Sequence, residues 1–192
     1  TFIIVSDHGF KEVTRYINLN VALKLAGHAR AKGPDLVECA AAVMSLGGVG
    51  CVYVTDPARK AELLPTLPSM FSGVEGIGRI LDGQEGPTIG MPSPEEDPLM
   101  GDLILFAEDG YLFNNSAEGE GVVTPIVNYS STHGYLASDP EMDGIFIATG
   151  AGIKKGVRLP RVSSLDIAPT IARLLGVTMP DPEGREIEEI LL

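Results

Sequence analysis

Short apolar runs that alternate with helical patterns constrain the fold of this chain more than any other feature of its sequence. Five such runs span residues 2–5, 50–54, 78–81, 102–107 and 144–149. Helical spacing is expected between them over residues 16–31, 35–46 and 58–70, although two prolines disturb the last stretch. Strands that alternate with helices predict an α/β fold.

The two ends of the chain carry the clearest local signals. The sequence opens on Thr-Phe-Ile-Ile-Val, a run typical of a strand buried on both faces of a parallel sheet. We therefore expect residues 1–192 to form the later part of one larger domain. Near the other end, residues 163–166 predict a helix start, Ile167, Ile171, Leu174 and Leu175 form an apolar stripe, and Gly176 predicts the stop.

Composition excludes several classes of protein. With 192 residues and 44% apolar content, the chain can bury a sizeable core and is not expected to be disordered. Its 14 Lys and Arg against 26 Asp and Glu leave a formal charge of −12, which argues against a nucleic-acid duplex as partner. No apolar run reaches the roughly 18 residues of a membrane span. Cys39 and Cys51 are too few for a disulfide framework and leave the compartment open.

Two segments lack any regular pattern. Residues 82–101 are rich in Gly and Pro and predict an exposed, irregular excursion, and residues 114–121 predict a surface loop. Two Asn-x-Ser sequons, at Asn114 and Asn128, match a short and common pattern. The glycine-rich stretches at residues 47–50 and 73–78 run into strands and do not open helices, so we interpret them as turns and not as nucleotide-binding loops.

Chemistry-bearing residues gather first in Ser6-Asp7-His8-Gly9-Phe10, directly after the opening strand. Gly9 permits a sharp turn there, so the side chains of Asp7 and His8 could converge on one point. A carboxylate oxygen and an imidazole nitrogen are suitable ligands for a divalent metal such as zinc. The alternative is that Asp7 caps a turn and His8 packs.

A second His-Gly turn occurs in Ser130-Ser131-Thr132-His133-Gly134-Tyr135, a segment too polar for a core. The chain has 3 histidines, and two of them in such turns favour metal binding over packing. The third, His28, has no acidic neighbour within four residues and is interpreted as scaffold or surface.

Together with two further segments, these motifs resemble the type I phosphodiesterase/nucleotide pyrophosphatase family of the alkaline phosphatase superfamily. The similarity covers essentially the whole chain and is carried, in order, by residues 6–10, residues 132–135, Met-Asp-Gly-Ile-Phe-Ile-Ala-Thr-Gly at 142–150 and Leu-Asp-Ile-Ala-Pro-Thr-Ile at 165–171. The resemblance implies a mostly parallel, alkaline-phosphatase-like sheet with flanking helices, of which this chain is the C-terminal part.

The resemblance also implies a two-metal site, usually zinc, at the carboxyl edge of the sheet, with a Thr or Ser nucleophile that is transiently phosphorylated or nucleotidylated. Other divalent metals are possible. Carried onto this sequence, Asp7 and His8 match the pair that binds one metal, and His133 matches the histidine that completes the other. The substrate would be a phosphorylated small molecule; diesters, monoesters, pyrophosphates and phosphonates stay open.

One departure from the family pattern is large. The nucleophile, an Asp and an Asp-x-x-x-His pair precede the Asp-His-Gly motif in the family, and would therefore lie upstream of Thr1. The residues four before the histidines are Ile4, Lys24 and Tyr129, so no such pair occurs here. We expect the chain alone to be inactive, and to need its missing N-terminal half or to self-associate.

Two other functions compete with this interpretation. A serine hydrolase is disfavoured because neither Ser6 nor Thr132 lies in a Gly-x-Ser-x-Gly elbow. A non-enzymatic interaction domain, or an inactive fragment that keeps the fold, would use the acidic segments 95–97 and 183–189 only for solvation or for a basic partner. Metal content distinguishes these alternatives, since a scaffold needs no zinc.

Overall fold

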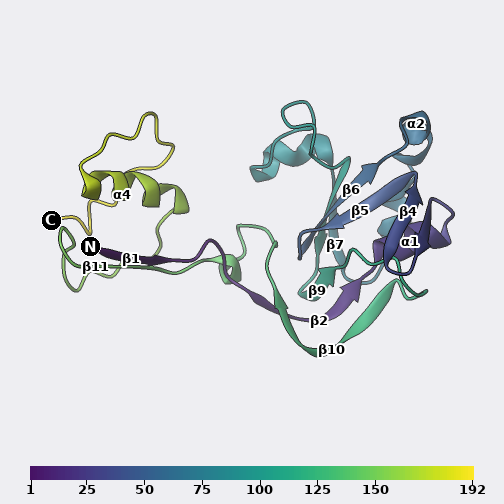
Figure 1. The fold of residues 1–192 in the computed structure, drawn as a ribbon, viewed down its shortest axis with the longest axis horizontal. Coiled ribbons are helices and arrows are strands. Elements are labelled where there is room, and N and C mark those ends of the chain that lie inside the picture. Colours follow the sequence, from purple (N-terminus) through teal and green to yellow (C-terminus); the bar gives the residue numbers. More distant parts are fainter. The chain divides into compact units, whose positions relative to one another are not determined.

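The computed structural model describes residues 1–192 throughout and divides them into two compact units. The smaller unit combines Thr1–Gly9 with Gly144–Leu192, and the larger unit is Phe10–Asp143. Figure 1 labels the elements of both. None of the helices is long and apolar enough to cross a bilayer.

The larger unit is built on an antiparallel sheet whose strand order is β5-β6-β8-β7. The strands are β5 (Ala41–Ser45), β6 (Val49–Val54), β8 (Leu103–Ala107) and β7 (Ile77–Asp82). The two central strands are buried along most of their length, and successive residues point to opposite faces. Val52 and Leu105 belong to the main apolar core, whereas Cys51 and Ile104 belong to a second cluster.

Three helices contribute further residues to the main core. They are α1 (Leu19–Leu25), α2 (Lys60–Leu63) and α3 (Leu67–Phe71). The short 3-10 turn η1 (Pro57–Arg59) lies directly before α2. Leu19, Leu23, Leu63 and Phe71 are fully buried and pack in the same cluster as Val52. One face of the sheet is therefore covered by these helices.

A second sheet in this unit has the order β10-β2-β9. Its strands are β10 (Val123–Thr132), β2 (Lys11–Ile17) and β9 (Gly110–Phe113); β3 (Ala29–Lys32) and β4 (Asp35–Cys39) form a separate hairpin. β10 runs antiparallel to β2, and their register pairs Thr132 with Lys11. This register brings the beginning of one strand beside the end of the other.

The smaller unit pairs β1 (Phe2–Val5) with β11 (Phe146–Thr149) in antiparallel fashion. After the turn η4 (Ser164–Asp166), helix α4 (Ile167–Leu175) ends at Gly176 in the left-handed conformation, as the sequence predicts. Phe146, Ala148 and Leu174 pack against a small core of Ile153, Ile187 and Ile190.

The α/β class and all five predicted strands are confirmed, but several details were wrong. The strand pairs within this chain are antiparallel except β2 with β9, whereas a mostly parallel sheet was expected. Residues 35–46 are not helical but form β4 and β5. Ala41 and Val43 are buried while the residues beside them are less so, and this alternation is typical of a strand. Within 16–31 only Leu19–Leu25 is an α-helix.

Two further expectations concern exposure. The opening strand is not buried on both faces, because Phe2 is 62% and Ile4 42% exposed. Residues 82–101 include the 3-10 helix η2 (Gly83–Ile89), capped by Asp82, and Ile89 and Met91 pack against the second cluster. A further 3-10 turn, η3 (Pro140–Met142), lies near the C-terminal end of the larger unit.

Candidate functional site

Asp7 and His8 follow β1 where its pairing with β11 ends. The Ser6 amide donates to the Ile145 carbonyl at 3.1 Å, and the Ile145 amide donates to the Ser6 hydroxyl at 2.9 Å. Gly144 lies against the Ser6 backbone so closely that a Cβ there would collide with the Ser6 carbonyl. The end of the strand is therefore held firmly, and the chain turns at the two candidate ligands.

The two side chains are placed differently. The side chain of Asp7 is 88% exposed and that of His8 is 29% exposed, with His8 Nε2 3.6 Å from Asp7 Oδ1. His8 Nδ1 lies 2.9 Å from the Gly9 carbonyl oxygen. Because that oxygen can only accept, this hydrogen bond requires the proton on Nδ1, and in the neutral imidazole the lone pair is then on Nε2. This is the orientation that a backbone carbonyl imposes on metal-binding histidines.

His133 follows β10 directly and is exposed. Because Thr132 pairs with Lys11, the neighbouring residues His133 and Phe10 also lie alongside. Their rings meet edge to face, with centroids 5.7 Å apart and planes at 86°. The residue that ends the first motif therefore contacts the histidine of the second.

The backbone at His133 is anchored by the glycine turn between β5 and β6. The Gly48 amide donates to the His133 carbonyl at 2.8 Å, and a Cβ on Gly48 would lie 2.7 Å from the Tyr135 ring. Gly134 has φ +83°, and a Cβ there would collide with the Leu46 carbonyl. The interpretation of residues 47–48 as a turn is confirmed. Its contacts with residues 132–135, here called the His133 segment, were not predicted.

Sequence reasoning also missed a charge cluster around one buried lysine beside this segment. The side chain of Lys11 is only 6% exposed, and its ammonium lies 2.5 Å from Asp109 Oδ1, 2.7 Å from Asp139 Oδ2 and 3.3 Å from Glu141 Oε2. It also lies 5.0 Å from the centre of the Tyr135 ring. These groups come from three distant stretches of sequence, so no local motif announces them.

Contacts and burial in this cluster shift the pKa values of Lys11, Asp139 and Tyr135. Burial by itself would lower the pKa of Lys11, but the hydrogen bonds to the three carboxylates outweigh it and raise that pKa above its usual range. The hydrogen bond from Lys11 lowers the pKa of Asp139. Burial raises the pKa of Tyr135 to about 12, and its hydroxyl donates to the Tyr111 carbonyl. These shifts keep Lys11 charged, Asp139 ionised and Tyr135 neutral near neutral pH.

The three predicted ligands divide between the two units. Asp7 and His8 are adjacent in the smaller unit and His133 lies in the larger one, so their convergence stays a prediction. No group of three or more His, Cys, Asp or Glu side chains is placed to hold a metal ion, and the carboxylates around Lys11 enclose an ammonium instead. His28 belongs to the turn after α1, where its amide donates to the Leu23 carbonyl.

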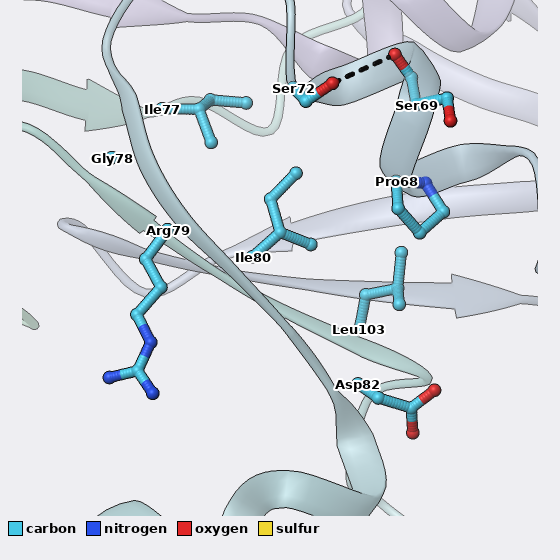
Figure 2. A pocket seen from close by; sticks show the side chains of 9 residues that line it. All are labelled: Pro68, Ser69, Ser72, Ile77, Gly78, Arg79, Ile80, Asp82 and Leu103. Carbon is cyan, nitrogen blue, oxygen red and sulfur yellow. Dashed lines mark hydrogen bonds between the residues drawn. The ribbon is translucent and has the colours of Figure 1, made fainter.

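A cavity of about 510 Å³ lies elsewhere in the larger unit, between α3 and strands β7 and β8. In Figure 2, Ile80 has Ser69 and Ser72, from α3 and its C-terminal end, on one side and Arg79 on the other. The side chain of Arg79 points away from the two serines. None of the predicted ligands lines this cavity. It offers no cluster of titratable groups comparable to that around Lys11.

Comparisons with known proteins follow the same motifs. A family model described as type I phosphodiesterase / nucleotide pyrophosphatase matches residues 1–136. No curated protein matches the chain.

Two ectonucleotide pyrophosphatase / phosphodiesterase structures show the same fold at low sequence identity. Human ectonucleotide pyrophosphatase / phosphodiesterase 5 superposes with a TM-score of 0.66 at 18% identity, covering 98% of this chain and 44% of that one. The murine protein gives 0.63 at 16% identity, covering 99% and 45%. Phosphonoacetate hydrolase from Sinorhizobium meliloti 1021 gives 0.48 at 17%, covering 76% and 35%. The chain spans less than half the length of these relatives.

Proposed function

The chain belongs to the type I phosphodiesterase / nucleotide pyrophosphatase family, and from this premise we propose that it carries part of the active site of a metal-dependent hydrolase. The bond cleaved is a phosphate ester, a phosphodiester or a nucleotide pyrophosphate, in a phosphorylated small molecule. The observation that carries the proposal is the contact between Phe10 and His133, because it joins the two segments that hold the candidate ligands.

The donor types suit zinc. One carboxylate and two imidazoles are the oxygen and nitrogen ligands that zinc takes in catalytic sites. His8 has Nδ1 engaged with a carbonyl, which directs Nε2 to a ligand role, and the Asp7 carboxylate is exposed. In this proposal Asp7 and His8 hold one ion and His133 completes the site of the other. Other divalent metals remain compatible with the same donors.

Chain connectivity limits how far His8 can lie from Phe10. His8 precedes Phe10 by two residues, so their Cα atoms are at most about 7 Å apart. Phe10 in turn contacts the His133 ring. A bound metal pair would polarise the phosphate and stabilise both the attacking and the leaving oxygen. The chain's own residues would orient the two metal positions.

Three donors are too few for two zinc ions, each of which normally has four ligands. We therefore propose that the remaining ligands and the Thr or Ser nucleophile come from a further segment, the missing N-terminal half. The share of the relatives' length that this chain spans is consistent with that proposal.

Hydrolysis of a nitrophenyl phosphodiester by the complete protein, expressed with any polypeptide that precedes Thr1 in its reading frame, tests the proposal. With zinc, we expect turnover that His133→Ala lowers by more than about 100-fold, since it removes a metal ligand. His28→Gln is the matched control and should keep turnover. If the complete protein binds no zinc and hydrolyses no phosphate ester when zinc is supplied, the interaction-domain alternative is correct.

A further inference from the structure

We infer that Lys11 is a positioning residue that holds the His133 segment in place for metal binding. This inference rests on the proposed function, since it assigns a role toward the same site. Lys11 follows Phe10 directly, and pairs across the sheet with Thr132, the residue before His133. No other buried cation lies in this part of the fold.

The ammonium ties three stretches of chain together. It reaches from the start of β2 to Asp109, in the turn between β8 and β9, and to Asp139 and Glu141, which follow the His133 segment. Asp139 also accepts from the Glu141 amide and so starts η3. Residues 132–139 are therefore fastened at both ends, at Thr132 by strand pairing and at Asp139 by Lys11.

The middle of the segment has its own contacts. The Gly48 amide donates to the His133 carbonyl, and the Tyr135 ring lies close to both the Lys11 ammonium and Gly48. Removing the ammonium would leave three carboxylates without their cation and would uncover one side of the Tyr135 ring. The segment that carries His133 would then lose its anchor at Asp139, while the strand pairing at Thr132 and the Gly48 contact would remain.

Lys11 does not have the features of a substrate-binding lysine. A lysine ammonium has three N–H donors, and Lys11 faces three carboxylates within 3.3 Å. No donor is left for a phosphate oxygen. The side chain is also almost wholly buried. Its effect on the reaction would therefore pass through His133.

Lys11→Met in the complete protein tests the inference, with zinc affinity by calorimetry and amide exchange at Gly48 in the metal-free protein as readouts. We expect zinc binding to weaken by about 10- to 100-fold, the range for residues that orient a metal ligand, and Gly48 exchange to accelerate. Lys11→Arg should restore part of both. Lys24→Met is the matched control, because the Lys24 ammonium donates to the carbonyls of Ala117 and Gly119 in a different loop.

Wild-type zinc affinity and Gly48 protection in a folded Lys11→Met protein would overturn the inference. If that variant does not fold, Asp139→Asn replaces it: asparagine can still cap η3, while the ion pair to the segment is lost. Unchanged zinc affinity in Asp139→Asn would overturn the inference equally. A wild-type protein that binds no zinc would instead refute the proposed function, and Gly48 exchange would still report whether Lys11 anchors the segment.

Discussion

The ring of Phe10 packs edge to face against the imidazole of His133, with their centroids 5.7 Å apart. One residue ends the Ser-Asp-His-Gly-Phe motif and the other lies in the Thr-His-Gly-Tyr motif, more than 120 positions later in the chain. Their contact follows from the pairing of Lys11 with Thr132 in the β2-β10 ladder. The antiparallel register thus brings the last residue of the first motif beside the histidine of the second.

Gly134 is predicted to be essential for the His133 turn. Gly134→Ala should destabilise the protein because it forces a left-handed φ of +83° on alanine and drives its Cβ into the Leu46 carbonyl. The matched control is Gly90→Ala, which has φ +79° but nothing within 4 Å. We expect about 1–2 kcal/mol of destabilisation for the control and about 1–3 kcal/mol more for Gly134→Ala, measured by urea unfolding. Equal losses would show that the close approach to Leu46 is unimportant.

The Lys11–Asp139 pair predicts a particular pH dependence of stability. The pKa of Asp139 is lowered in the folded state, so its contribution is present above its unfolded value of about 3.9 and is lost as pH falls through the folded value. The pKa of Lys11 is raised, so its contribution persists below about 10.4 and is lost as pH rises further.

Stability should therefore form a plateau between about pH 4 and 10 with respect to this pair. Asp139→Asn should lower the plateau and flatten the acid limb, which thermal unfolding at a series of pH values would measure. An acid limb of unchanged slope would show that the Lys11–Asp139 ion pair does not contribute to the pH dependence of stability.

The sequence predicts the elements of this fold better than their pairing. Apolar runs identified the strands, and the stripe from Ile167 to Leu175 identified α4 with its stop at Gly176. Residues 35–46 misled because an alanine-rich run fits a helix as well as it fits two short strands, and only pairing of Ala41 with Val54 decides between them.

The residues of the candidate site were likewise predicted only in part from the sequence. Asp7, His8 and His133 stood out because their residue types and neighbouring glycines form local motifs. Lys11 did not, because its partners Asp109 and Asp139 are 98 and 128 positions away, and only the folded chain collects them. The close approach of Gly48 to Tyr135 is likewise a tertiary contact that appears in the sequence only as a glycine.

The exposed face of β1 and β11 predicts self-association of the chain on its own. Ile4 and Ile147 are direct cross-strand partners and are 42% and 54% exposed. Because each side chain is already about half buried, covering both would contribute about 1.5–3 kcal/mol. Light scattering should detect oligomers or a bound complementary segment, and Ile4→Lys should reduce association. Val37→Lys is the control, since Val37 is 54% exposed on β4. A stable monomer with a cooperative thermal transition would contradict this prediction.

The isolated chain of 192 residues is predicted to have no phosphodiesterase turnover. It supplies three of the proposed ligands and no nucleophile, so added zinc should not produce hydrolysis of a nitrophenyl phosphodiester, whereas adding the preceding segment should. Turnover by the purified chain alone, abolished by His133→Ala, would show that the catalytic set is complete within these residues.

Anomalous scattering at the zinc edge, from crystals of the complete protein, is the most direct measurement of whether Asp7, His8 and His133 share one metal centre. The predicted result is two zinc peaks roughly 3.5–4 Å apart, one bound by Asp7 and His8 and the other by His133. Zinc bound elsewhere, or His133 at the opposite end of the sheet from Asp7, would contradict the assignment of these three residues.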